Sequence, residues 1–318
     1  MKQNLKAIEK KKLRKMKLDR IARNKYVYFM AIPVMLWYLI FSYIPMYGVT
    51  LAFRKFTPGG LMSYIFGGNW VGFKYFEQIM TDPLFYRALK NTLIISAMKL
   101  SIEFPLVIVL VLLLNEIKFK IFKRVTQTIM YLPHFLSWVI IATIMTQMFS
   151  VDGGIITNVI AVFNGGEKIN YLTQPDKFRW ILVAATCFKN MGWDTIIYLS
   201  ALAGIPAELY EAADVDGASR FRKVISITLP SLLPTIVTML LIKISNMIAG
   251  DFDQIYNLYN SSVYDVADII ETYLFRVGVT SGKFSMATAM GLFKSVISLM
   301  MLAGANFISR KITGNGIW

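Results

Sequence analysis

Six long apolar stretches divide this chain, and shorter polar segments separate them. A helix needs about 20 apolar residues to cross the hydrocarbon core of a bilayer. Backbone groups in lipid find no water, so such stretches form helices that satisfy their own hydrogen bonds. The pattern therefore predicts an all-α, polytopic membrane protein with six transmembrane helices, at about residues 26–53, 89–114, 126–149, 180–203, 225–249 and 284–308.

Composition agrees with this class, since 17% of the 318 residues are charged and 56% are hydrophobic. A soluble domain carries about 25% charged residues. The net charge of +15 does not indicate nucleic-acid binding, because 11 of the 34 basic residues lie in residues 1–25. We expect these residues to form a basic arm on the anionic cytoplasmic leaflet, as an amphipathic segment or simply as a positive-inside anchor.

The loops between the predicted helices differ in charge according to the face they would occupy. If the N-terminus is cytoplasmic, three further inner segments are basic, around residues 118–124, 220–223 and 310–311. The predicted outer loop at 250–283 instead gathers five acidic residues. Because basic residues concentrate in cytoplasmic loops, both termini are expected in the cytoplasm.

The segment between the fourth and fifth predicted helices, residues 206–230, is charged and rich in turn formers. Apolar residues recur at helical spacing up to Ala213, and Gly217 then follows Asp216 and breaks the helix. Two short helices joined by a glycine form a protruding structure, here called the knob (residues 206–222).

The order Glu211-Ala212-Ala213, three residues, Gly217, nine residues, Ile227-x-Leu229-Pro230 resembles the EAA loop of permease subunits in binding-protein-dependent ABC importers. The resemblance implies the type I ABC importer transmembrane fold over residues 26–318. It also implies that residues 206–230 are the coupling loop that docks on a cytoplasmic ATPase. The coupling residues would be Glu211, Ala212, Ala213, Asp216, Gly217, Ala218 and Ser219.

Four further motifs are similar to the subgroup that imports complex oligosaccharides and polysaccharide fragments, the relatives of maltose and alginate permeases. They are FSYIPMYG (41–48), NWVGFKYF (69–76), ALKNTL (88–93) and GNGIW (314–318). The subgroup implies a bacterial plasma-membrane protein that works with a second permease subunit, two ATPase subunits and an extracellular solute-binding protein. A non-sugar cargo, or less readily an ion-driven secondary transporter, remains an alternative.

No catalytic constellation is expected in this chain. A phosphate-binding loop needs GxxxxGK[ST], and the pair Gly282-Lys283 is followed by Phe284 and lacks the first glycine. One histidine, His134, and one cysteine, Cys187, make a zinc site or a catalytic triad improbable. ATP and Mg²⁺ are therefore expected on partner subunits, with no cofactor and no metal on this one.

Polar residues inside membrane helices are costly, so they face the bundle interior or a watery cavity. Lys99 and Glu103 are one helical turn apart and are expected to pair with each other. A sugar pocket would need hydroxyl partners and an aromatic plane, which Trp193, Asn190 and Asn246 would supply. Lys189 and Lys243 favour an acidic or hydroxylated ligand, unless they pair with Asp194 or Asp251. The candidate substrate residues are Lys189, Asn190, Trp193, Asp194, Lys243 and Asn246, with helix packing as the alternative role.

Overall fold

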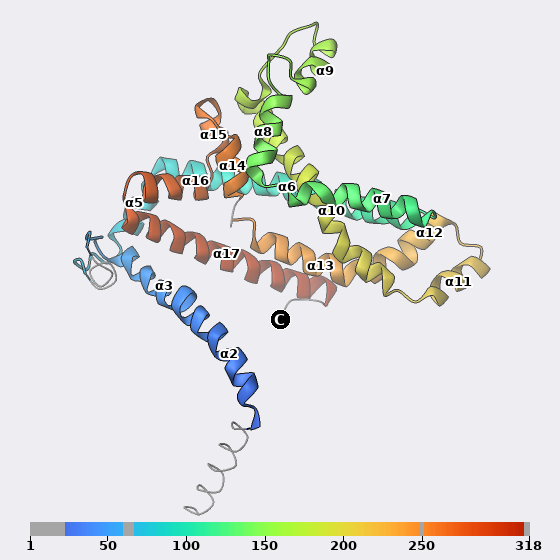
Figure 1. The fold of residues 1–318 in the computed structure, drawn as a ribbon, viewed down its shortest axis with the longest axis horizontal. Coiled ribbons are helices and arrows are strands. Elements are labelled where there is room, and N and C mark those ends of the chain that lie inside the picture. The colour runs from blue at the N-terminus through green and yellow to red at the C-terminus, as the bar shows by residue number, and fades with distance from the viewer. Residues whose placement is uncertain (1–22, 60–66, 249–250, 315–318) are drawn as a thin grey trace, which may run out of the picture. The chain divides into compact units, whose positions relative to one another are not determined.

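A computed structural model describes residues 23–59, 67–248 and 251–314, and most of this length is helical (Figure 1). The chain divides into two compact units, Met1–Phe73 and Lys74–Trp318. The predicted basic arm at 1–25 lies outside the described residues except for its last three positions. All but the first glycine of the motif at 314–318 also lies outside them.

The first unit contains one long apolar helical segment, Lys25–Phe53, which corresponds to the first predicted span. It is built from α2 (Lys25–Tyr38), the π-helical turn η1 (Leu39–Tyr43), α3 (Ile44–Met46) and the 3₁₀ helix η2 (Tyr47–Phe53). Pro45 lacks an amide hydrogen and its ring crowds the preceding turn, so the wider π turn just before it accommodates the ring. Beyond this segment, an isolated antiparallel bridge joins Arg54 to Trp70.

The second unit begins with α5 and ends with α17. Its α-helices are α5 (Lys74–Met80), α6 (Pro83–Glu116), α7 (Lys120–Tyr131), α8 (Trp138–Met148), α9 (Ile155–Phe163), α10 (Pro175–Ala203), α11 (Ala207–Val215), α12 (Arg220–Lys223), α13 (Leu229–Ser245), α14 (Phe252–Leu258), α15 (Tyr264–Ala267), α16 (Ile270–Phe275) and α17 (Phe284–Thr313). Short 3₁₀ and π turns connect some of them: η3 (Leu132–Phe135), η4 (Tyr171–Thr173), η5 (Val224–Thr228), η6 (Ser261–Val263) and η7 (Arg276–Thr280).

Four helical segments among the described residues are long and apolar enough to cross a membrane: Lys25–Phe53, Pro83–Glu116, Arg220–Ser245 and Phe284–Lys311. They match the first, second, fifth and sixth predicted spans. The fifth predicted span begins earlier than expected and ends at Ser245 rather than Ala249. If the bent pair Lys120–Phe135 and Trp138–Met148 is counted as one span, the described residues contain five segments that are long and apolar enough to cross a membrane. This is one fewer than the six predicted.

The prediction of one continuous helix over residues 126–149 is wrong. The chain forms Lys120–Phe135 and then Trp138–Met148, and the two parts meet at an angle of 100°. Pro133 lies in the 3₁₀ turn η3 where the first part ends, and Ser137 begins the second by accepting a hydrogen bond from the amide of Ile140 at 3.3 Å. Apolar composition continues through this bend, which is why the pattern did not reveal it.

The fourth predicted span is the 29-residue helix α10, which packs against α6, α7 and α13. It is long enough to span a bilayer, but it is less hydrophobic than the four segments named above. Its buried residues include Lys189, Thr186 and Thr195, which a lipid-facing helix would not carry. The helix packs against three others along part of its surface, which explains the polar residues it buries, while Trp180, Phe188 and Ile197 remain exposed on another side.

Candidate functional site

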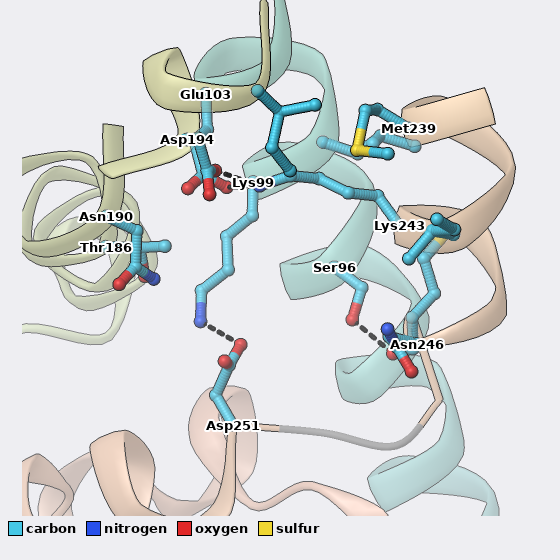
Figure 2. A pocket seen from close by; sticks show the side chains of 14 residues that line it. Ser96, Lys99, Glu103, Thr186, Asn190, Asp194, Met239, Lys243, Asn246 and Asp251 are labelled. Atoms are coloured by element: carbon cyan, nitrogen blue, oxygen red, sulfur yellow. Dashed lines mark hydrogen bonds and ion pairs between the residues drawn. The ribbon is translucent and has the colours of Figure 1, made fainter. Parts of the chain in front are cut away.

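A cavity of about 370 Å³ lies between α6, α10, α13 and the start of α14 (Figure 2). Nine of its 14 lining residues are polar or charged, and apolar side chains contribute the rest of its surface. The lining residues are Ser96, Lys99, Leu100, Glu103, Thr186, Asn190, Asp194, Ile197, Met239, Ile242, Lys243, Asn246, Met247 and Asp251. On α6 these positions follow one helical stripe, and on α10 Thr186, Asn190 and Asp194 are each four residues apart.

An ion-pair cluster joins three of the cavity's helices. The Lys243 Nζ on α13 lies 2.6 Å from Oδ2 of Asp194 on α10 and 3.1 Å from Oε2 of Glu103 on α6. The residue Glu103 is only 5% exposed, and its Oε1 has no hydrogen-bond partner among the described residues. Two carboxylates therefore share one ammonium group, and one buried carboxylate oxygen is left with an open accepting position.

The expected pairing of Lys99 with Glu103 is wrong. Lys99 Nζ instead donates to Asp251 and to Gln254 of α14, as Figure 2 shows for the aspartate. The Gln254 amide in turn donates to the carbonyl of Leu182 at 2.7 Å. Partners from a distant part of the sequence replace the local one, so this lysine fastens α14 to the bundle.

Four of the six candidate substrate residues line the cavity: Asn190, Asp194, Lys243 and Asn246. The other two do not. Lys189 Nζ donates to the carbonyl of His134 at 2.8 Å and to that of Leu136, and it pairs with neither Asp194 nor Asp251.

Trp193, expected to be the aromatic plane of a sugar pocket, stacks instead on the ring of His134, with centroids 4.5 Å apart and planes 3° from parallel. Each helical residue turns by about 100°, so Lys189 and Trp193 point away from the face that holds Asn190 and Asp194. The cavity residues that were not chosen as candidates from the sequence are Ser96, Lys99, Leu100, Glu103, Thr186, Ile197, Met239, Ile242, Met247 and Asp251.

The knob forms as predicted, with two short helices and a glycine between them. Helix α11 contains Glu211, Ala212 and Ala213, and Gly217 follows it with a φ of +71°. The amide of Ala218 donates to the carbonyl of Ala213 at 2.8 Å, and the amide of Gly217 donates to that of Asp214 at 3.1 Å. This bonding closes the helix end through a left-handed residue, a position that glycine occupies without strain.

The second knob helix is capped and braced by side chains. Ser219 begins α12 and accepts a hydrogen bond from the amide of Arg222 at 3.3 Å. Lys223 Nζ lies 2.6 Å from Asp214 Oδ1, which ties α12 back to α11. The seven proposed coupling residues lie within residues 211–219 of this structure; five are exposed and Ala213 and Ala218 are partly exposed. In Figure 1 the knob projects at one end of α10 and α13.

The knob is also fastened to the helix that follows it. The Tyr210 hydroxyl on α11 lies 2.9 Å from the hydroxyl of Thr228, the last residue of η5. From Arg220 to Ser245 the chain is helical without a break, running from α12 through the π turn η5 into α13. The second knob helix α12 and the cavity residue Lys243 therefore belong to one continuous helical segment, whereas α11 is a separate helix.

Comparison with known proteins places this architecture in a family. Residues 104–314 match the model of the "Binding-protein-dependent transport system inner membrane component". The polygalacturonan/rhamnogalacturonan transport system permease protein YteP of Bacillus subtilis (strain 168) is 41% identical over 98% of this chain and 96% of its own. Protein LplB of the same organism is also 41% identical, over 94% of this chain and 92% of its own.

A solved structure has the same fold. A chain of a bacterial ABC transporter involved in the import of the acidic polysaccharide alginate superposes with a TM-score of 0.84 and 37% identity, covering 93% of this chain and 98% of that one. The arabinooligosaccharides transport system permease protein AraP of B. subtilis is more distant, at 27% identity over 91% of this chain and 88% of its own. The chain therefore belongs to the family of binding-protein-dependent transport system inner membrane components, the membrane-embedded permeases of ABC transporters.

Proposed function

We propose that this chain is one of two permease subunits of a type I ABC importer that takes up oligosaccharides or polysaccharide fragments. An extracellular binding protein delivers the sugar, and two separate ATPase subunits bind and hydrolyse ATP with Mg²⁺. The relatives named above, whose own names refer to polygalacturonan, arabinooligosaccharides and alginate, support this cargo class. Both termini and the knob lie in the cytoplasm under this proposal, in agreement with the basic residues of that face.

The observation that carries the proposal is a polar cavity and an exposed knob built on the same two helices, α10 and α13. The cavity offers amide, hydroxyl and carboxylate groups, which are hydrogen-bond partners for sugar hydroxyls. Its two lysines already have carboxylate partners within the chain. With both lysines paired, the described lining residues leave no unpaired cation for an anionic ligand. The site therefore suits a hydroxyl-rich ligand.

Among the coupling residues, Glu211 is exposed on α11, where it is free to meet a basic group in the cleft of an ATPase subunit. Gly217 permits the turn that sets the angle between the two knob helices. Closure of the ATPase pair would displace the knob as a rigid body, and the cavity would then open alternately to the two faces. Glu211 and Gly217 thus have different roles, one in docking and one in shape.

Substitution of Gly217 tests the coupling role. A Cβ at this position meets no atom within 4 Å, so the cost of a side chain comes from the positive φ and not from crowding. Asparagine tolerates this backbone region and valine does not. We expect Gly217→Val to abolish ATP-driven uptake in vesicles while the binding protein still captures sugar, and Gly217→Asn to retain uptake. Normal uptake by the valine variant would refute the proposed coupling.

A further inference from the structure

The short helix α14 presents two chemically different faces. Gln254, Ile255 and Leu258 are buried, and Gln254 helps to hold Lys99. On the other side Tyr256 and Asn257 are exposed, together with Asp253 one turn earlier. Residues three and four apart lie on one side of a helix, so Asp253 groups with Tyr256 and with Asn257 on the exposed surface, although Tyr256 and Asn257 themselves point about 100° apart. This surface is turned away from the core that fastens the helix.

A groove of about 360 Å³ runs between α14 and α8, two helices that pack against each other. Its polar lining consists of Thr143, Thr146, Gln147 and Asn257, and its apolar part consists of Val139 and Ala142. None of these six side chains is charged. The groove therefore offers neutral hydroxyl and amide groups, in contrast to the ion pairs of the main cavity.

Several of these groups keep hydrogen-bonding capacity for a ligand. The Thr143 and Thr146 hydroxyls donate to the carbonyls of Val139 and Ala142, each at 2.9 Å, and both oxygens can still accept. One amide hydrogen of Asn257 donates to the carbonyl of Asp253 at 2.7 Å, which orients the side chain. A second amide hydrogen and the amide oxygen remain available to a ligand.

Tyr256 adds a fixed aromatic ring on the exposed side of α14, one position before the groove residue Asn257. Its ring stacks on Phe252 with centroids 5.0 Å apart and meets Phe275 edge-on at 5.3 Å, yet the residue is 44% exposed. Packing of this kind holds the ring in one orientation without covering it. An exposed aromatic ring one helical position from a cluster of hydroxyl and amide groups supplies both parts of a sugar contact, because the CH face of a sugar packs on the aromatic plane.

We propose that the α8–α14 groove, together with the exposed ring of Tyr256 on the neighbouring face of α14, is a second carbohydrate subsite that binds sugar units extending beyond the main cavity. This inference rests on the proposed function, since it assumes that the cargo is an oligosaccharide. Asp251 lines the main cavity and Asn257 lines the groove, six residues apart, or about 9 Å along a helix. A short sugar fits the cavity alone, whereas a longer one reaches the second subsite.

The experiment compares uptake of disaccharides and pentasaccharides from oligogalacturonide and galacto-oligosaccharide size ladders by the complete transporter in vesicles. We expect Asn257→Leu to raise KM for the pentasaccharide by about tenfold through loss of amide hydrogen bonds. KM for the disaccharide should not change, and this normal uptake also shows that the variant folds. Asn164→Leu, at an exposed position after α9, is the matched control and should leave both constants unchanged.

The aromatic ring is tested with a second pair of variants. Tyr256→Phe keeps the stacking plane and should retain pentasaccharide uptake, whereas Tyr256→Leu should raise its KM. An equal rise in KM for both sugar lengths, or an unchanged KM for the pentasaccharide in Asn257→Leu, would overturn the second subsite alone. If the wild-type transporter carried no sugar of either ladder, the proposed function would fail, and the subsite would fail with it.

Discussion

Alanine in place of Gly192 tests how closely α7 and α10 approach. A Cβ at this position would lie 2.1 Å from the carbonyl oxygen of Met130 and 2.6 Å from its carbonyl carbon. Cβ contacts under 3.0 Å are essentially never found, so the backbone would have to yield by at least about 0.9 Å. Because the obstacle is backbone and not the end of a flexible side chain, one of the two helices must move.

The magnitude follows from two opposed effects. Overpacking of this kind costs about 1–3 kcal/mol, and a backbone obstacle belongs in the upper half of that range. Alanine in a helix interior recovers up to about 1 kcal/mol relative to glycine. The net loss of unfolding free energy expected for Gly192→Ala is therefore about 1–3 kcal/mol. Uptake should also fall, because α10 carries Asn190 and Asp194.

The assay is thermal unfolding of the purified transporter in detergent, followed by sugar uptake after reconstitution. Gly291→Ala is the matched control, because its Cβ would meet Leu274 Cδ1 at 3.5 Å, an ordinary contact. The control should unfold at or above the wild-type temperature. Equal stability of Gly192→Ala and Gly291→Ala would refute the close approach of α7 and α10.

Three other predictions concern charge and pH. Lys243→Met removes the cation that Glu103 and Asp194 share. We expect it to lower the free energy of unfolding by about 2–3 kcal/mol, measured by thermal unfolding. Adding Glu103→Gln should recover at least about 1 kcal/mol, and strict additivity of the two changes would contradict the ion-pair cluster. Asp268→Asn removes the buried carboxylate paired with Arg276 and should cost about 2 kcal/mol. It should also speed proteolysis of residues 259–280, and an unchanged rate would contradict this role. Burial and a neighbouring tyrosine raise the pKa of Tyr259 to about 12. Its neutral form therefore stabilises the fold, fully below pH 10 and less as the pH rises toward about 12. Tyr259→Phe should remove this loss of stability at alkaline pH, as measured by unfolding across the same pH range.

Composition predicted the apolar helices well because each is a long, nearly uninterrupted run. Helix α6 begins six residues before its predicted start, since Pro83 and the Asp82 cap extend it beyond the apolar part. The bend after Phe135 could not be predicted in the same way. Hydrophobicity reports how long a segment stays apolar and carries no information on its direction.

Four of the six candidate substrate residues line the cavity, and helix geometry explains why the other two do not. Asn190 and Asp194 face it while Lys189 and Trp193, one position earlier in each case, contact the η3 turn. Both faces of α10 carry polar residues, so polarity alone does not show which face lines the cavity. The four-residue spacing of Thr186, Asn190 and Asp194 would have shown it. The true partner of Lys99 could not be read locally, because it lies about 150 residues away in sequence.

The unbroken helical segment Arg220–Ser245 has a consequence for how force passes through the molecule. A displacement at Arg220, the knob end of the segment, would pass along it directly to Lys243, and the π-helical turn η5 lies on the way. Helix α10 ends at Ala203, and a non-helical link of three residues separates it from α11, so the same push reaches Asp194 less directly. Under the proposed coupling the two helices would move unequally, and the contact between Lys243 and Asp194 is where they would shift against each other.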